Sequence, residues 1–177
     1  VALCPMDLDD LRNVNGTLGH KVGDQVISIV AERINALTER WNDTTDYSSY
    51  LACLGSDEFV VLITGFEDKS ELSPLLEELL FTVRQKMEIG NNQIFMGASI
   101  GVCLTPEHAK DSETMLKNAD MALFKVKQAS KHDFSFYQAA YREELEKRIQ
   151  LEYELIDAIA NNEFEVYYQP VINTQTN

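Results

Sequence analysis

The chain has 177 residues, of which 45% are hydrophobic, and its formal net charge is −14. This length and composition suffice for one domain with its own core and an appendage. The negative charge argues against a partner with a phosphate backbone and against an anionic membrane surface, because both would be repelled. We therefore expect no nucleic acid binding and no direct membrane contact, whereas a polyanionic small ligand is compatible with this charge if metal ions bridge it.

The three cysteines, Cys4, Cys53 and Cys103, lie far apart inside apolar runs. This spacing fits neither a disulfide framework nor a zinc site, so we expect reduced thiols in a cytoplasmic protein. No apolar run approaches the roughly 18 residues that span a bilayer, and no segment resembles a signal peptide. Because the chain opens as if inside a strand, we expect its natural form to extend upstream, and a membrane anchor elsewhere in such a larger protein stays open.

The opening residues Val1–Met6 are typical of a strand, and three later stretches carry apolar residues at helical spacing. These stretches cover residues 26–41, 72–87 and 115–126. Around them we predict a hairpin at Gly55, a long strand over Ile94–Leu104 and a short strand over Asp133–Tyr137. A hairpin combined with helical crossovers gives strands of mixed direction. The sequence therefore predicts an α/β (α+β) fold, with a central mixed, mainly antiparallel sheet of about five strands flanked by helices.

Beyond Tyr137 the sequence changes character. A charged stretch runs into isoleucines at helical spacing, which predicts a connecting helix over residues 138–160. A strand-like segment, Phe164–Pro170, follows. Because an isolated helix and strand cannot form a core, we expect residues 161–177 to be the start of a truncated second domain and residues 1–137 to be the first domain.

A run of five residues, Gly55-Ser56-Asp57-Glu58-Phe59, separates two apolar stretches that are rich in strand formers. This pattern predicts a β-hairpin with the glycine at a positive φ. Acidic residues at a hairpin tip are usually explained as a solvated polar turn. That explanation would suffice here if the hairpin stood alone.

A second acidic run, Asp7-Leu8-Asp9-Asp10, ends the opening strand, and strand alternation places Asp7 and Asp9 on one face. If this strand lies beside the hairpin, Asp7 meets Asp57 and Glu58. Converging carboxylates repel one another unless a divalent cation binds between them. Hard oxygen ligands of this kind suit Mg²⁺ or Mn²⁺, so the sequence predicts a metal site at this point.

The segment Asn15–Asp24 contains several glycines and precedes the first long helix, which predicts a loop that enters the helix near Gly23. A connector with a helix cap explains this segment without any function. Alternatively, Asn15 and Asp24 hydrogen-bond the edge of a purine, because an amide and a carboxylate complement guanine's donors and acceptors.

A basic cluster at and beyond the third helical stretch is unusual in so acidic a chain. It consists of Lys117, Lys125, Lys127, Lys131 and His132. A solvated helix face is one explanation. Phosphate binding is the other, since a lysine ammonium can serve phosphate as a point charge.

Together these pieces resemble the GGDEF family of diguanylate cyclase domains over residues 1–137, with the hairpin as a variant of the signature motif. The opening strand and helix match the family pattern at Asp7, Asp9, Asn15, Gly19, His20, Gly23 and Asp24. Ser99–Val102 and Ala119–Lys127 resemble two later family blocks in the same order. Leu151–Val171, with Tyr168-Gln169-Pro170, resembles the first helix and strand of an EAL phosphodiesterase domain, although no EAL motif is present.

The resemblance implies a nucleotidyl-cyclase-like fold and a nucleotidyltransferase reaction of bacterial second-messenger signalling. Two GTP molecules condense into cyclic di-GMP with loss of pyrophosphate, and each subunit of a homodimer holds one half-site. Metal ions orient the phosphates and neutralise developing charge. The implied partners are therefore GTP, a second subunit, the attached EAL-like domain and an upstream sensor.

The resemblance also implies roles for particular residues. Asp7, Asp57 and the Leu8 carbonyl hold Mg²⁺, and Glu58 is a further ligand or an active-site carboxylate. Guanine is read by Asn15 and Asp24, and the nucleotide passes close to Gly55 and Ser56. Phosphate contacts come from Arg12 and Lys127, and Lys131 stands where the family usually has arginine.

Several positions depart from the family pattern. Ser56 replaces a glycine, Cys53 replaces an arginine, and Ser130-Lys131-His132 replaces Gly-Arg-Asn. A serine side chain intrudes where backbone approaches the nucleotide, and lysine loses a bidentate phosphate contact. Asp46 and Ser49 occupy the positions of the Arg-x-x-Asp inhibitory site, which we expect to be absent, and the family's N-terminal helix is missing.

Three functions therefore stay open: an active diguanylate cyclase, a weak or inactive GTP-binding domain that regulates an attached EAL domain, and a dimerisation module without nucleotide. Turnover separates the first two. GTP binding separates the second from the third.

Overall fold

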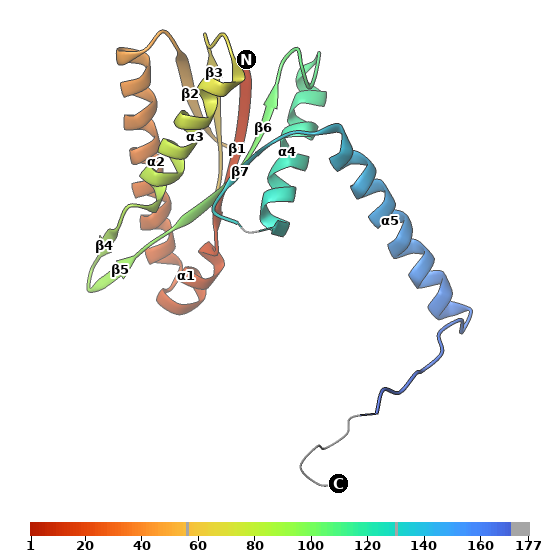
Figure 1. The fold of residues 1–177 in the computed structure, drawn as a ribbon. Coiled ribbons are helices and arrows are strands. Elements are labelled where there is room, and N and C mark those ends of the chain that lie inside the picture. The colour runs from red at the N-terminus through yellow and green to blue at the C-terminus, as the bar shows by residue number, and fades with distance from the viewer. Residues whose placement is uncertain (56, 130, 171–177) are drawn as a thin grey trace. The chain divides into compact units, whose positions relative to one another are not determined.

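The computed structural model describes residues 1–55, 57–129 and 131–170 (Figure 1). Ser56, Ser130 and residues 171–177 lie outside the described residues, and with them the predicted nucleotide contact of Ser56 and the end of the EAL-like segment at Val171. Within the described ranges, no helix is long and apolar enough to cross a membrane. The chain forms two compact units, Val1–Tyr141 and Arg142–Asn177.

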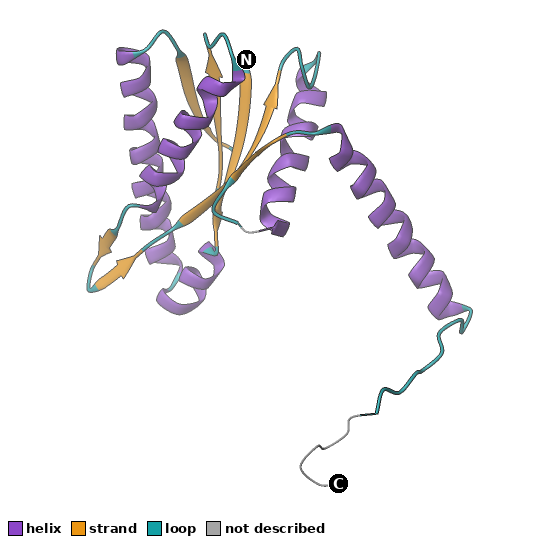
Figure 2. Ribbon diagram, viewed as in Figure 1, coloured by secondary structure: helices purple, strands orange, loops and turns teal. Residues whose placement is uncertain are grey.

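A five-stranded sheet forms the centre of the first unit (Figure 2). Its strands are β1 (Ala2–Asp9), β2 (Ser48–Cys53), β3 (Glu58–Thr64), β6 (Gly97–Leu104) and β7 (Phe134–Phe136), and their spatial order is β2-β3-β1-β6-β7. Neighbouring strands are antiparallel except β6 and β7, which are parallel. The predicted mixed, mainly antiparallel sheet is therefore confirmed.

Helices lie on both faces of this sheet. They are α1 (Leu11–Leu18), α2 (His20–Thr44), α3 (Leu72–Arg84) and α4 (Ser112–Ala129), with a short 3₁₀ turn at Lys69–Glu71 before α3. The buried stripes of α2 and α3 pack on one face, and α4 packs on the other (Figures 1 and 2). The three predicted stretches thus correspond to helices with a buried apolar face, although α3 ends at Arg84 and Leu116 of α4 is exposed.

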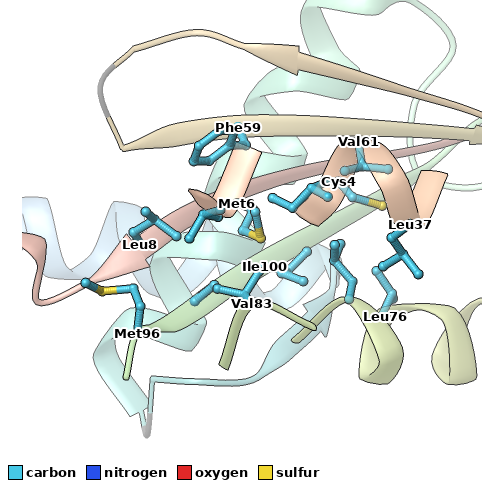
Figure 3. Close-up of a cluster of buried hydrophobic side chains, with 14 of the residues drawn as sticks. Cys4, Met6, Leu8, Leu37, Phe59, Val61, Leu76, Val83, Met96 and Ile100 are labelled. Carbon is cyan, nitrogen blue, oxygen red and sulfur yellow. The ribbon is translucent and has the colours of Figure 1, made fainter. Parts of the chain in front are cut away.

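Alternation along β1 decides which of its side chains face which helices. Ala2, Cys4, Met6 and Leu8 are almost fully buried with α2 and α3 (Figure 3). The odd-numbered side chains consequently face α4, and Leu3 packs there against residues of β6 and α4. This alternation directs Asp7 and Asp9 toward the α4 side of the sheet.

Gly101 of β6 allows α4 to pack very closely on the sheet. A Cβ added at Gly101 would lie 2.1 Å from the Ala119 carbonyl oxygen and 2.4 Å from the Leu123 nitrogen. Only glycine leaves room for the helix backbone to approach the strand this closely. The close seat brings the last turns of α4 beside the end of β1.

Two local predictions are wrong near the first helices and the hairpin. The expected loop over Asn15–Asp24 is helical except at Gly19, whose φ of 87° separates α1 from α2. One residue in this conformation suffices to change the helix direction. At the hairpin, the described glycines with positive φ do not include Gly55. β2 ends at Cys53 and β3 begins at Glu58, so the two strands are too far apart in the chain for the two-residue turn on which the prediction rested.

The strand prediction over Ile94–Leu104 merges two elements. A separate two-stranded hairpin, β4 (Met87–Ile89) and β5 (Asn92–Ile94), precedes β6. Met87 therefore belongs to β4, although it continues the apolar spacing of α3. The short strand predicted over Asp133–Tyr137 is confirmed as β7.

The helix α5 (Ala139–Ala160), most of which belongs to the second unit, lies where a helix was predicted, and none of its residues is buried. The strand predicted over Phe164–Pro170 is wrong, because residues 163–170 form no helix or strand. A strand needs a neighbour to satisfy its backbone hydrogen bonds. The assignment of residues 161–177 to an EAL-like domain stays a prediction.

Candidate functional site

A cavity of about 470 Å³ lies at the C-terminal end of β1. Its walls come from the end of β1, the start of α1, the β2–β3 connection, the end of α4 and Lys131 beyond that helix. The lining residues are Asp7, Leu8, Asp9, Asp10, Leu11, Arg12, Asn13, Asp57, Lys127 and Lys131. The structure thus brings together six predicted site residues from distant parts of the chain: Asp7, Leu8, Arg12, Asp57, Lys127 and Lys131.

The Asp7 carboxylate faces α4 and forms an ion pair with Lys127, with 2.6 Å between Oδ2 and Nζ. Its side chain is only 15% exposed. Burial raises the pKa of the Asp7 carboxyl above its ordinary value, and the charges of Asp57 and Asp9 add to this shift, whereas Lys127 opposes it. Asp7 is therefore a partly buried carboxylate whose charge Lys127 balances.

The hairpin is tied to the end of β1 by a backbone hydrogen bond from the Leu8 nitrogen to the Asp57 oxygen, 3.1 Å long. In the β1–β3 register, Asp7 lies directly opposite Glu58. The predicted adjacency of the opening strand and the hairpin is therefore confirmed. It exists because β1 and β3 are neighbours in the sheet.

Glu58 lines a different hollow from Asp57. This second hollow, of about 290 Å³, lies between the start of β3 and α4 and shares Asp7 and Lys127 with the cavity. Its other walls include Asp120 and apolar side chains. Burial, and then the charge of Glu58, raises the pKa of Asp120.

The acidic side chains at the end of β1 are the candidate ligands of the predicted metal. Among the residues that the structure describes, no group of three or more Asp, Glu, His or Cys side chains could hold a metal ion. The three-acid convergence of Asp7, Asp57 and Glu58 is thus not formed. Mg²⁺, however, is usually bound by one or two carboxylates together with substrate phosphates, and Asp7 and Asp57 line the same cavity. The residues present fit a site of that kind.

The predicted basic cluster divides into two parts. Lys117 pairs with Glu113 on the surface of α4, and Lys125 lies over the Tyr141 ring. Lys127 and Lys131 line the cavity. The Lys131 ammonium lies 2.9 Å from Asp10 Oδ1, and this hydrogen bond raises the pKa of Lys131.

The last member of the basic cluster, His132, contacts Asp9 instead of lining the cavity. The Asp9 side chain is 1% exposed, and its Oδ2 lies 2.8 Å from His132 Nδ1. Ser99 donates its hydroxyl to Asp9 Oδ1 at 2.8 Å. Asp9 is therefore enclosed by protein donors, although alternation places it on the same side as Asp7.

Asn15 and Asp24 lie at the corner between α1 and α2 and do not line the cavity. A Cβ at Gly23 would lie 1.8 Å from Asn15 Oδ1, so the Asn15 amide occupies the space that this glycine leaves. The same oxygen is buried and has no hydrogen-bond partner among the described residues. Buried polar atoms are rarely left unsatisfied, so this acceptor marks a place for a donor. Asp24 follows Gly23 and is exposed.

The contacts of Gly55 are modest, since a Cβ there would lie 3.6 Å from Glu58 Oε2. Sequence reasoning missed Asp10, Ser99, Asp120 and the pairing of His132 with Asp9. Asp10 was visible as the last acid of its run. The His132 contact left no signal in the sequence, because it joins residues 123 positions apart.

The sheet order and the acid-lined cavity at the end of β1 define a cyclase-like α+β domain. Residues 1–133 match the family model described as "Diguanylate cyclase, GGDEF domain". This match covers most of the chain, and the chain belongs to the GGDEF family, whose members occur in cyclic di-GMP signalling proteins.

Three known proteins illustrate the similarity. The chain is 32% identical over 167 residues to the bifunctional diguanylate cyclase/cyclic di-GMP phosphodiesterase MucR of Pseudomonas aeruginosa, covering 94% of this chain and 23% of MucR. It is 30% identical over 172 residues to the cyclic di-GMP phosphodiesterase NbdA of the same organism, covering 97% and 21%. The solved GGDEF domain of YfiN (TpbB), also from Pseudomonas aeruginosa, superposes with a TM-score of 0.74 at 25% identity, covering 82% and 81%. The chain thus spans less than a quarter of the length of the two curated relatives.

Proposed function

We propose that this domain binds GTP and acts as a diguanylate cyclase, condensing two GTP molecules into cyclic di-GMP and pyrophosphate across a homodimer. The observation that carries the proposal is the cavity at the end of β1, which gathers four aspartates and three cationic side chains from separate parts of the chain. An anionic ligand with bound cations matches this mixture of charges.

The phosphates bind in the cavity. Lys127, Lys131 and Arg12 supply positive charge, and each of the two lysines is paired with an aspartate that a phosphate can replace. Asp7 and Asp57, with the Leu8 carbonyl, would hold Mg²⁺, which neutralises negative charge on the phosphates when it is bound.

The guanine base binds at the corner between α1 and α2. The Asn15 oxygen accepts a hydrogen bond from guanine's N–H groups and thereby gains the partner that it lacks. The neighbouring Asp24 carboxylate accepts a second one. A base without N–H groups at these places leaves both acceptors unsatisfied, which favours guanine over adenine.

In the reaction, the 3′-oxygen of one nucleotide bonds to the α-phosphorus of the other, and the bond from that phosphorus to the pyrophosphate oxygen breaks. The hydroxyl proton must pass to a base. Glu58, opposite Asp7 in the β1–β3 register, is the carboxylate that we assign to this step or to the metal. The two active sites face each other only in a dimer, so turnover depends on protein concentration.

A second candidate function has specific support. The charge of Asp7 is already balanced by Lys127, and Lys131 stands where a bidentate arginine would bind phosphate better. NbdA, whose name is that of a phosphodiesterase, contains a region similar to this chain. The alternative is a GTP-binding domain with little or no turnover that regulates an attached EAL phosphodiesterase domain. The cytoplasmic location, the EAL-like domain and the upstream sensor stay predictions.

The deciding experiment incubates the protein with GTP and Mg²⁺ at concentrations high enough for dimers, and detects cyclic di-GMP by chromatography. GTP binding is measured by calorimetry on the same sample. Product supports the cyclase, and binding without product supports the regulatory domain. If the protein neither binds GTP nor forms cyclic di-GMP, both functions are contradicted.

A pair of variants locates the site. Asp57→Ala/Glu58→Ala should abolish turnover and weaken Mg²⁺-dependent GTP binding. The matched control, Glu143→Ala/Glu146→Ala, removes the same charge from exposed positions of α5 and should change neither. Unchanged activity in the first double variant would contradict the site assignment.

A further inference from the structure

Two consecutive residues after α4 adopt a backbone conformation that side chains disfavour. Lys131 and His132 have φ values of 52° and 54°, in the left-handed region. Neither is a glycine, and such residues persist only where their surroundings hold them in place. Lys131 lines the cavity, so whatever holds this pair also decides where the Lys131 ammonium lies.

The Lys131 backbone nitrogen donates to the Val126 oxygen at 3.2 Å, and the other contacts that hold the pair are made by His132. Its imidazole Nδ1 and its backbone nitrogen both donate to Asp9 Oδ2, at 2.8 and 3.1 Å. With the Ser99 hydroxyl on the other oxygen, the buried Asp9 carboxylate has three donors. Removing the imidazole donor leaves a buried carboxylate under-satisfied, which is costly in so dry a position.

The His132 imidazole also packs against Gly97, which has no side chain. A Cβ at Gly97 would lie 1.8 Å from His132 Nδ1, so the ring lies directly against the glycine at the start of β6. His132 is therefore fixed on one side by the missing side chain of Gly97 and on the other by Asp9.

The chain neighbours of His132 and Asp9 extend this contact to the cavity. Lys131 precedes His132, and Asp10 follows Asp9, so the two pairs lie side by side. Beside the contact of His132 with Asp9, Lys131 Nζ forms an ion pair with Asp10 Oδ1 at 2.9 Å. His132 itself lines a separate small hollow with Arg84 and Glu77, away from the cavity. His132 therefore reaches the cavity only through its neighbours, and of these Lys131 carries the positive charge that a phosphate needs.

We propose that His132 is a positioning residue: by binding Asp9 against Gly97, it holds the left-handed pair that places the Lys131 ammonium where nucleotide phosphates bind. This inference rests on the proposed function for its effect on GTP. Its structural part, that His132 determines the surroundings of Lys131, is independent of GTP.

The nucleotide test is a double-mutant cycle on the whole chain, with GTP dissociation constants from calorimetry for Lys131→Ala, His132→Ala and the double variant. Each single variant should weaken binding by about tenfold. The double variant should bind no more weakly than Lys131→Ala, because His132 acts through that lysine. Losses that simply multiply would overturn the inference and indicate a separate structural role.

Two conservative variants sharpen the cycle. Asparagine places an N–H donor at the δ position, as His132 does with Nδ1, whereas glutamine places it one atom further out. His132→Asn should keep GTP affinity within about twofold of the wild type, and His132→Gln should resemble His132→Ala. Equal behaviour of the two variants would contradict the inference. Thermal melting of each variant establishes that it is folded.

A final measurement needs no nucleotide. The Asp10 contact raises the pKa of Lys131. The ¹³C chemical shift of the Lys131 ε-carbon, followed against pH, should therefore give a pKa above the ordinary lysine value in the wild type and in His132→Asn. In His132→Ala and His132→Gln the titration should fall back toward the ordinary value. If it stays raised in all variants, His132 does not position Lys131, whether or not the wild type binds GTP. If the titration behaves as expected but the wild type binds no GTP, only the proposed function fails.

Discussion

The cavity at the end of β1 and the corner between α1 and α2 differ in whether their polar side chains have partners. In the cavity, three aspartates that line it have basic partners: Asp7 with Lys127, Asp9 with His132 and Asp10 with Lys131. At the corner, the Asn15 oxygen is buried and has no hydrogen-bond partner within the described ranges.

This difference separates two ways of binding. A ligand that enters the cavity exchanges one charged partner for another, so its net gain is small and depends on salt. A donor that enters the corner supplies a hydrogen bond that the protein otherwise lacks. We therefore expect the corner to determine the selectivity for the base, and the cavity to determine the affinity for phosphate and metal.

The largest effect is expected when the corner is filled. In Gly23→Ala the new Cβ takes the space of the Asn15 amide. GTP affinity measured by calorimetry should fall by about 30-fold, because the amide loses its place. The control is Gly16→Ala, at a helical glycine with no atom within 4 Å of the added Cβ. That variant should keep its GTP affinity and gain about 1 kcal/mol in the free energy of unfolding.

Asn15→Ala tests the same corner without adding bulk. GTP binding should weaken by about tenfold, while the free energy of unfolding should stay the same or rise, because an unsatisfied buried oxygen is removed. Asn118→Ala is the matched control, since that buried amide donates to the His108 oxygen at 2.8 Å. It should lose about 1–3 kcal/mol in urea unfolding. Equal destabilisation of both variants would mean that Asn15 is satisfied.

Lys127→Met tests whether cavity binding is an exchange. Without the ammonium, Asp7 is free to bind a cation, so Mn²⁺ affinity in the absence of nucleotide should rise about threefold, as measured by electron paramagnetic resonance. Lys117→Met removes an ion pair from the same helix, away from the cavity, and should leave Mn²⁺ binding unchanged. Weaker Mn²⁺ binding in Lys127→Met would show that the lysine does not compete for Asp7.

The smallest effect concerns Asp120 in the neighbouring hollow. Because its pKa is raised in the folded protein, the wild type loses stability as pH rises through that pKa. Asp120→Asn should therefore melt higher than the wild type at pH 7, by about 1–2 °C, and the difference should vanish near pH 3. Asp111, whose pKa is lowered by hydrogen bonds from Thr114, should show the opposite sign. Asp111→Asn should melt lower at pH 7, and this deficit should shrink in acid.

Patterns within one element predicted the fold well. The apolar stripes of α2, α3 and α4 and the alternation of β1 follow from local spacing, because one face of each element must be buried. The errors fall where spacing is ambiguous. Met87 continues the stripe of α3 but belongs to β4, and a single residue, Gly19, replaces the loop expected over Asn15–Asp24.

The acids of the site were also visible in the sequence, but their partners were not. Nothing in the spacing tells that Lys127 pairs with Asp7 while His132 pairs with Asp9. Those contacts depend on how closely α4 sits on β6, which Gly101 determines. Likewise, Asp57 and Glu58 are adjacent in the chain, yet they line different hollows, since Asp57 lies in the connection before β3 and Glu58 is the first residue of that strand.

The central place of β1 has a consequence for how the chain is made. β1 comes first among the sheet strands in chain order, yet it pairs with β3 and β6, and its Ala2 lies opposite Leu104. At the usual speed of synthesis, roughly 5 to 20 seconds separate the translation of these two residues. During that interval one edge of β1 has no strand to bind, which is the kind of exposed surface that chaperones protect. Assembly of the cavity must therefore wait until β6 and α4 have left the ribosome.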